Sequence, residues 1–323
     1  MSTTSERVFV AGHRGLVGSA LIRALRASGY GDSVVRPHDE LDLEDAAAVH
    51  AFFARERPAL VFLAAAKVGG ILANSTYPAE FIRSNLAIQL NVVEACYRSG
   101  VRKLMMLGSS CVYPKHARQP IPETELLTGP LEPTNEPYAV AKIAGIRLCQ
   151  AYNAQYGTNY ISVMPTNLYG PGDNFDLQTS HVVPALIRRF HDAKLAGAPV
   201  VMVWGTGNAL REFLHVDDMA RACVHLMERY DSSEIINIGA GGEISIAELA
   251  ALIRRVVGYA GRLEFDINRP DGTPRKLLDS SRLFATGWRP TIPLERGIRE
   301  TYDWFLANRT GARGVARGSV SPS

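Results

Sequence analysis

The sequence predicts an α/β protein in which a doubly wound parallel sheet is joined to a smaller C-terminal region. Apolar runs typical of buried strands alternate with amphipathic helical patterns through the first half of the chain, which indicates βαβ units. A glycine-rich turn joins the first expected strand to the first expected helix. Beyond about residue 165 the pattern becomes irregular and rich in turn residues, which indicates a change of architecture.

Each element of the first half is expected from a local pattern. Short apolar runs predict strands at 8–11, 33–36, 60–65, 103–107 and 160–164. Amphipathic patterns between these runs predict helices at 16–27, 45–56, 81–99 and 137–156. Parallel strands need helical crossovers, so this alternation predicts helices on both faces of one sheet.

Composition and charge exclude several classes of partner. The chain has 323 residues, of which 46% are hydrophobic and 21% are charged, as is ordinary for a globular protein. The formal net charge is +3, but Arg309, Arg313 and Arg317 lie in a Gly/Ser/Ala-rich stretch that contains no acid. The rest of the chain is close to neutral, so we expect no nucleic acid and no membrane as partner.

Cysteine use and apolar runs indicate the compartment. The four cysteines, Cys96, Cys111, Cys149 and Cys223, have no paired spacing for metal or redox work, so we expect no metal. The amino end has no signal-peptide pattern, and the longest apolar run, 59–66, is too short to span a bilayer. We therefore expect a cytoplasmic protein.

Three glycines after the first strand indicate a phosphate site. Gly12, Gly15 and Gly18 occur in "VFVAGHRGLVGSALIRAL" with G-x-x-G-x-x-G spacing. Glycines here allow a tight turn and close backbone approach, so that a pyrophosphate rests on the amino end of the helix. This context predicts a Rossmann-type dinucleotide site. The alternative is a glycine turn that holds no ligand.

Charges near the second strand favour NADP(H) over NAD(H). An NAD site usually carries an acid about 20 residues beyond the loop, which binds the ribose 2′-hydroxyl. Here "VVRPHDE" places Arg36 and His38 near that point, and Arg14 lies inside the loop. A guanidinium suits a 2′-phosphate.

A tyrosine and a lysine form the first candidate catalytic group. Tyr138 and Lys142 are spaced i, i+4 in "EPYAVAKIAG", on one face of a helix. A nearby ammonium favours the phenolate, so we expect Lys142 to lower the Tyr138 pKa toward neutrality. Ser109, which follows a strand in "LGSSCVYPK", is expected to give the reacting oxygen a second hydrogen bond.

Two further residues point to proton abstraction. Cys111 lies two residues beyond Ser109, so in extended geometry both side chains point to the same side. A thiolate there is a competent base for a proton next to a carbonyl. His181 follows the candidate cap Ser180 at an expected helix start and can return a proton. From spacing alone, a packing cysteine and a surface histidine remain the alternatives.

The fold and the Ser–Tyr–Lys group resemble the extended short-chain dehydrogenase/reductases. Longer motifs between about residues 7 and 305 resemble the GDP-L-fucose synthase family: "AGHRGLVGSA", "LAAAKVGGI", "LGSSCVYPK", "EPTNEPYAVAKIAGI", "MPTNLYGP", "REFLHVDDMA" and "RKLLD". The resemblance implies a multifunctional oxidoreductase and isomerase. Such an enzyme epimerises GDP-4-keto-6-deoxy-D-mannose at carbons 3 and 5, then reduces carbon 4 with NADPH.

The resemblance also implies roles for residues that match the family's motifs. The catalytic set is Ser109, Tyr138 and Lys142 for reduction, and Cys111 and His181 as base and acid for epimerisation. Implied cofactor contacts are Gly12, His13, Arg14, Gly15, Leu16, Val17, Gly18, Leu107, Gly108, Ser109, Ser110, Tyr138, Lys142, Pro165, Thr166, Asn167, Leu168 and His181, with Arg36 and His38 beside the 2′-phosphate. Implied GDP-sugar contacts are Arg189, Trp204, Arg211, Asp271 and Lys276. His38 stands where the family has an arginine.

These patterns predict the organisation of the chain. We expect residues 1–165 to form the NADP-binding region, to which some later segments return, residues 166–308 the substrate-binding region, and residues 309–323 a disordered tail. Helices 81–99 and 137–156 are expected to form the contact of a homodimer. Rival functions are another GDP-sugar epimerase-reductase such as GDP-L-colitose synthase, an NAD-retaining nucleotide-sugar 4-epimerase, and a non-enzymatic dinucleotide sensor.

Overall fold

The structure is a computed structural model that describes residues 6–31, 33–269, 271–309 and 314. The predicted tail, 309–323, lies outside the described residues except for positions 309 and 314. Within the described part, no helix is both long and apolar enough to cross a membrane.

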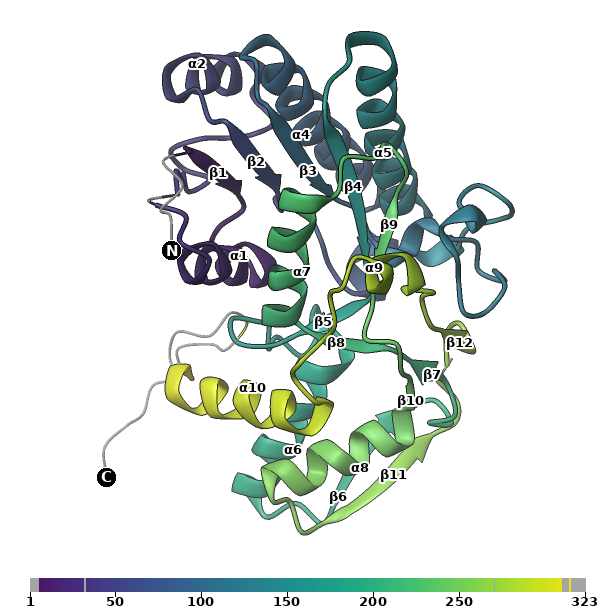
Figure 1. Ribbon diagram of the computed structural model, residues 1–323. Coiled ribbons are helices and arrows are strands. Elements are labelled where there is room, and N and C mark those ends of the chain that lie inside the picture. Colours follow the sequence, from purple (N-terminus) through teal and green to yellow (C-terminus); the bar gives the residue numbers. More distant parts are fainter. Residues whose placement is uncertain (1–5, 32, 270, 310–313, 315–323) are drawn as a thin grey trace.

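A parallel sheet of five strands forms the centre of the larger region (Figure 1). Its order is β1-β2-β3-β4-β9, and every neighbouring pair is parallel. The strands are β1 (Val8–Ala11), β2 (Leu60–Leu63), β3 (Lys103–Leu107), β4 (Tyr160–Pro165) and β9 (Ile236–Ile238). The predicted α/β fold class, with a Rossmann-type sheet, is confirmed.

Helices cover both faces of this sheet because side chains point alternately to either side of each strand. One hydrophobic cluster contains Phe9 and Val61 and packs beneath α2 (Ala46–Glu56), α4 (Pro78–Arg98) and α5 (Glu136–Tyr156). The other contains Val10 and Phe62 and packs beneath α1 (Leu16–Ala27) and α7 (Val216–Arg229). Burying each such side chain contributes about 1.5–3 kcal/mol. Because both faces of the sheet are buried, the strand sequences are continuous apolar runs.

One predicted strand is wrong. Residues 33–36 lie beside β1, but only Val34 pairs with it, through a single parallel bridge to Phe9. The Val34 N–H donates to the Val8 carbonyl at 2.7 Å, and the Val34 carbonyl accepts from Val10 N–H at 3.2 Å. The ladder ends there because the chain of β1 turns away at Gly12, where φ is +85°.

A second region packs below the carboxyl ends of the central strands (Figure 1). It contains three small sheets, β10-β7-β12, β11-β6 and β5-β8. Its own core gathers Phe175, Phe190, Val203, Ile253 and Phe305. The strands are β5 (Asn167–Tyr169), β6 (Val200–Trp204), β7 (Leu210–Arg211), β8 (Phe213–His215), β10 (Ile244–Ser245), β11 (Arg262–Asp266) and β12 (Arg275–Lys276). The helices are α6 (Val182–Ala196), α8 (Ile246–Val257) and α10 (Leu294–Asn308), while the short α3 (Ile71–Thr76) and α9 (Ser281–Ala285) lie in connecting segments.

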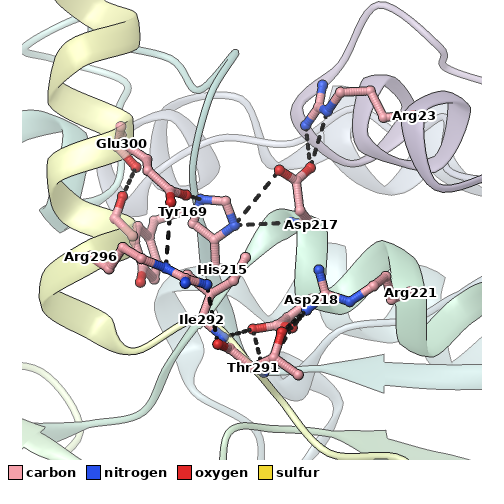
Figure 2. Close-up of polar contacts among 12 residues, drawn as sticks. Arg23, Tyr169, His215, Asp217, Asp218, Arg221, Thr291, Ile292, Arg296 and Glu300 are labelled. Atoms are coloured by element: carbon pink, nitrogen blue, oxygen red, sulfur yellow. Dashed lines mark hydrogen bonds and ion pairs between the residues drawn. The ribbon is translucent and has the colours of Figure 1, made fainter. Parts of the chain in front are cut away.

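A polar cluster joins the two regions (Figure 2). Asp217, in the first turn of α7, pairs with Arg23 on α1. The Nδ1 of His215 accepts from the Asp217 backbone N–H at 3.2 Å, and its Nε2 lies 3.8 Å from Glu300 on α10. Asp218 is fully buried and accepts from the backbone N–H groups of residues 291 and 292. This cluster holds α10 against helices α1 and α7 of the larger region.

Candidate active site

The glycine loop between β1 and α1 packs too closely for side chains. A Cβ at Gly12 would lie 2.8 Å from the Ala65 backbone, and a Cβ at Gly18 would lie 2.1 Å from the Gly12 carbonyl oxygen. Gly15 is the N-cap residue of α1 and makes no side-chain capping bond. The amino end of α1 therefore presents backbone N–H groups and the positive end of its dipole, which suit a phosphate.

The three basic residues predicted to read the cofactor differ in their surroundings. The Arg14 guanidinium is mostly exposed and lies 3.9 Å from Asp39. Arg36 packs over the Phe52 ring and pairs with Glu56 at 2.9 Å, so part of its charge is neutralised. His38 is exposed. Arg14 and His38 are thus the more accessible basic side chains near the loop.

The end of β3 meets the start of α5, and this brings the Ser–Tyr–Lys group together. Lys142 is buried, donates to the Leu107 carbonyl at 2.8 Å, and lies 5.8 Å from the centroid of the Tyr138 ring. A hydrogen bond links Tyr138 to Ser109. One hydroxyl, one phenol and one ammonium therefore surround the carboxyl end of β3.

The expected effect of Lys142 on Tyr138 is wrong in this structure. Burial raises the Tyr138 pKa, and the neighbouring Cys111 raises it further, while the hydrogen bond with Ser109 opposes the change. Burial also lowers the Lys142 pKa to about 8. The ammonium donates to a strand carbonyl, and Tyr138 is half-buried. Tyr138 is consequently a protonated donor at neutral pH.

Cys111 lies beside the same group. The Ser109 hydroxyl donates to the Cys111 Sγ at 3.1 Å, and the Cys111 N–H donates back to the Ser109 Oγ at 3.3 Å. The predicted proximity is present, but its expected cause is wrong. Residues Ser110–Val112 form a 3₁₀ turn capped by Ser109, and this turn, not extended backbone, folds the thiol onto the hydroxyl.

His181 is the N-cap residue of α6, so the expected Ser180 cap is wrong: the Ser180 Oγ is buried without a hydrogen-bond partner. The imidazole is reachable by solvent but crowded by protein. Burial lowers the His181 pKa, and the charge of Lys276 lowers it further. Lys276 and Cys111 both line one small hollow of about 50 Å³ that opens to solvent. The thiol and Lys276 therefore border the same cleft, and His181 lies close enough to Lys276 for its charge to act on the imidazole.

The predicted GDP-sugar residues gather on the second region. The Arg189 guanidinium lies 5.2 Å from the centroid of the exposed Trp204 indole. Asp271 accepts from the Thr206 N–H and Oγ1, both at 2.7 Å, so it clamps the turn that follows Trp204. Arg211 and Lys276 are paired neighbours on β7 and β12, and burial lowers the Arg211 pKa.

Two residues of this neighbourhood were missed from the sequence. Arg269 lies 5.0 Å from the centroid of the Trp204 ring, and its position two residues before Asp271 was the available signal. Glu212 is fully buried beside Arg211, and a charged residue between apolar strand positions was its signal. A larger hollow, about 750 Å³, lies against α8. Its lining includes Arg211 but none of the five predicted catalytic residues, whereas Cys111 lines the smaller hollow.

Comparison with known proteins shows what the chain is similar to. Residues 8–239 match the model of the NAD dependent epimerase/dehydratase family. GDP-L-fucose synthase 1 from Arabidopsis thaliana is 60% identical over 308 residues, or 95% of each chain. GDP-L-fucose synthase from Escherichia coli strain K12 is 57% identical over 320 residues, or 96% of this chain and 100% of the other. A crystal structure of a GDP-L-fucose synthetase from Naegleria fowleri bound to NADP has a TM-score of 0.90 at 31% identity, covering 97% and 98% of the two chains. The resemblance stated from the motifs is confirmed.

Proposed function

Because the chain belongs to the NAD dependent epimerase/dehydratase family, we propose that it converts GDP-4-keto-6-deoxy-D-mannose to GDP-L-fucose. It inverts carbons 3 and 5 and then reduces carbon 4 with NADPH. Full-length relatives that carry this activity in their names support the proposal. The single observation that carries it is the 3.1 Å contact between the Ser109 hydroxyl and the Cys111 thiol, which joins a candidate base to a reductase group.

The cofactor is NADP(H). The close-packed glycine loop and the uncapped amino end of α1 fit its pyrophosphate. Arg14 and His38 are the exposed basic side chains beside the 2′-phosphate, and Arg36 supports them from a half-buried position. Residues 107–110 and 165–168 contact the rest of the molecule. When bound, NADPH supplies the hydride that carbon 4 receives.

Epimerisation uses Cys111 and His181. The keto group at carbon 4 acidifies the hydrogens on carbons 3 and 5, and the Cys111 thiolate removes each of them as a proton. Hydrogen bonds from Ser109 and Tyr138 stabilise the negative charge that develops on the carbonyl oxygen. His181 returns a proton to the opposite face of the sugar. Burial and the charge of Lys276 lower the His181 pKa, which makes the protonated imidazole a stronger acid but a scarcer one at neutral pH.

Reduction uses the same oxygen. Tyr138 is protonated at neutral pH because burial raises its pKa, so it can transfer its proton to the oxygen of carbon 4 as the hydride arrives. Lys142, held by the Leu107 carbonyl, fixes the positive charge beside the phenol. The donors that stabilise the enolate also polarise the ketone, so one site serves both steps.

The diphosphate and guanine of the substrate lie over the second region. Arg211 and Lys276, adjacent on β7 and β12, neutralise the diphosphate together with Arg189. Trp204 presents its exposed indole beside the Arg189 and Arg269 guanidinium groups. Residues 1–165 thus serve mainly the cofactor, and residues 166–308 mainly the substrate.

The chain acts as a homodimer in the cytoplasm. Large apolar side chains are exposed on α4 (Leu86, Leu90 and Tyr97) and on α5 (Val140 and Tyr156). Two copies that pair these helices would bury them in a four-helix contact. The four cysteines are free thiols, as expected in a reducing compartment.

The test is turnover in heavy water. Purified protein, NADPH and GDP-4-keto-6-deoxy-D-mannose should give GDP-L-fucose with deuterium at carbons 3 and 5, read by NMR, with one NADPH consumed per product. Deuterium-free product of unchanged configuration would contradict the epimerase activity. Turnover of this ketone without net NADPH consumption would show epimerisation without reduction. Interconversion of 4-hydroxy GDP-sugars without net cofactor consumption would identify a cofactor-retaining 4-epimerase instead, and turnover of only a 3-deoxy substrate would identify the colitose reaction.

A further inference from the structure

Glu212 occupies the break between β7 and β8 with its side chain buried inside the second region. Its Oε1 accepts from the backbone N–H groups of Ala240 and Gly241, at 2.7 and 2.9 Å. Its Oε2 accepts from the Leu278 N–H at 3.1 Å. One carboxylate therefore joins the segment after β9 to the segment after β12.

The backbone of Glu212 extends the same network. Its carbonyl accepts from the Asn167 side chain at 2.8 Å and from the Thr166 hydroxyl at 3.4 Å. Its N–H donates to the Lys276 carbonyl at 3.3 Å. This single residue thus connects the 165–168 segment, the end of the central sheet and the strand that carries Lys276.

The surroundings of this carboxylate leave little freedom. A Cβ at Gly239 would lie 2.5 Å from the Glu212 Oε1, so the chain beside it must be glycine. Burial raises the Glu212 pKa, and the backbone N–H groups that donate hydrogen bonds to its carboxylate oppose that change. A buried carboxylate is costly unless its lone pairs are satisfied. Backbone donors from two segments satisfy it here, which fixes both segments relative to β7.

We propose that Glu212 is a positioning residue for the GDP-sugar diphosphate, because it holds Arg211 and Lys276 in register on β7 and β12. The proposal rests on the function proposed above. Arg211 is the neighbour of Glu212 in the chain, and Lys276 is both the register partner of Arg211 and the acceptor of the Glu212 N–H. Two cations that share one phosphate site bind it strongly only when their separation is fixed.

The experiment measures GDP and NADPH affinity of Glu212→Gln by calorimetry. Glutamine keeps the shape but turns one acceptor into a donor that faces a backbone N–H. The Kd for GDP should rise about tenfold to a hundredfold, and so should KM for the GDP-sugar. The Kd for NADPH should stay within about twofold, because Asn167 and Thr166 bind the backbone carbonyl, which the substitution keeps.

Asp218→Asn is the matched control. Asp218 is an equally buried carboxylate that also accepts backbone N–H groups, from residues 291 and 292 (Figure 2). The Asp218→Asn protein should have a lower free energy of unfolding than the wild type but the same Kd for GDP. In an Arg211→Ala background, Glu212→Gln should weaken GDP binding less than it does in the wild type, because their effects share one cause.

An unchanged Kd for GDP in Glu212→Gln, or an equal loss in Asp218→Asn, would overturn the assignment. If Glu212→Gln does not fold, Glu212→Asp carries the test: its shorter arm should weaken GDP binding at least threefold, roughly the lower range for one strained hydrogen bond, and an unchanged Kd would overturn the proposal. Failure of the wild type to bind GDP would instead overturn the proposed function on which this assignment depends.

Discussion

At the scale of residues, the site depends on groups whose burial cannot be predicted from the sequence. The i, i+4 spacing of Tyr138 and Lys142 correctly predicted that they share a helix face, but not their electrostatics. The structure buries Lys142 and half-buries Tyr138, and loss of solvent raises the Tyr138 pKa and lowers the Lys142 pKa to about 8. Arg269 and Glu212 were missed because their partners come from distant segments of the chain.

The lowered Lys142 pKa predicts how reduction depends on pH. The ammonium is lost as the pH rises through about 8, and with it the positive charge beside Tyr138. The rate of NADPH oxidation should therefore fall above this pH. Tyr138 does not account for such a fall, because its raised pKa keeps it protonated there.

This pH dependence is measured as kcat/KM for the 4-keto sugar between pH 6.5 and 9.5. Lys142→Met should be slower by about a hundredfold, the usual scale for a proton-transfer group, and should lose the alkaline fall. A wild-type profile that stays flat across this range would show that Lys142 is not titrating in the reaction.

At the scale of elements, most boundaries followed from local chemistry. The strand at 103–107 and the helix at 16–27 are present as predicted, since an apolar run and an amphipathic period each determine one element. The strand predicted at 33–36 is reduced to a single bridge, because strand pairing needs a straight partner and β1 turns away at Gly12. The 3₁₀ turn at Ser110–Val112 also escaped prediction, although it is what brings Cys111 to Ser109.

The close packing between β1 and α1 predicts the effect of Gly18→Ala. The new Cβ would lie 2.1 Å from the Gly12 carbonyl oxygen, so the loop must shift. The expected loss is about 1–3 kcal/mol of stability, as is typical of overpacking, with at least tenfold weaker NADPH binding. Thermal unfolding and calorimetry measure the two effects.

Gly242→Ala is the control for this change, because nothing lies within 4 Å of its added Cβ. It should keep both the wild-type melting temperature and NADPH affinity. If Gly18→Ala binds NADPH as tightly as Gly242→Ala does, the loop is a structural turn and the pyrophosphate lies elsewhere.

At the scale of the whole molecule, the cleft lies where two regions meet. Ser109, Cys111 and Tyr138 come from the sheet domain, while Arg189, Arg211 and Lys276 come from the second region. The cluster around His215 and Asp217 ties α1 and α7 to α10 (Figure 2). Sequence patterns indicate each region, but the contacts across them depend on long-range packing that no local pattern encodes.

The exposed face of α4 and α5 predicts the oligomeric state. Leu90→Lys places a charge on a side chain that is 55% exposed in the single chain, so the proposed dimer should dissociate to monomers in sedimentation experiments. Leu195→Lys, on α6 and 60% exposed, should leave the dimer intact. A Leu90→Lys protein that sediments as the wild type does would rule out this contact.

The central claim is that one cleft holds two chemistries, with Cys111 inverting the sugar and Tyr138 reducing it. Deuterium incorporation at carbons 3 and 5 in heavy water tests it most directly, with Cys111→Ala and Tyr138→Phe compared at equal protein concentration. Cys111→Ala should lose the exchange by roughly 10²–10⁴-fold, while Tyr138→Phe should still exchange both positions and lose about a hundredfold or more in NADPH oxidation. Wild-type exchange in Cys111→Ala would contradict the account, because the base would then lie elsewhere.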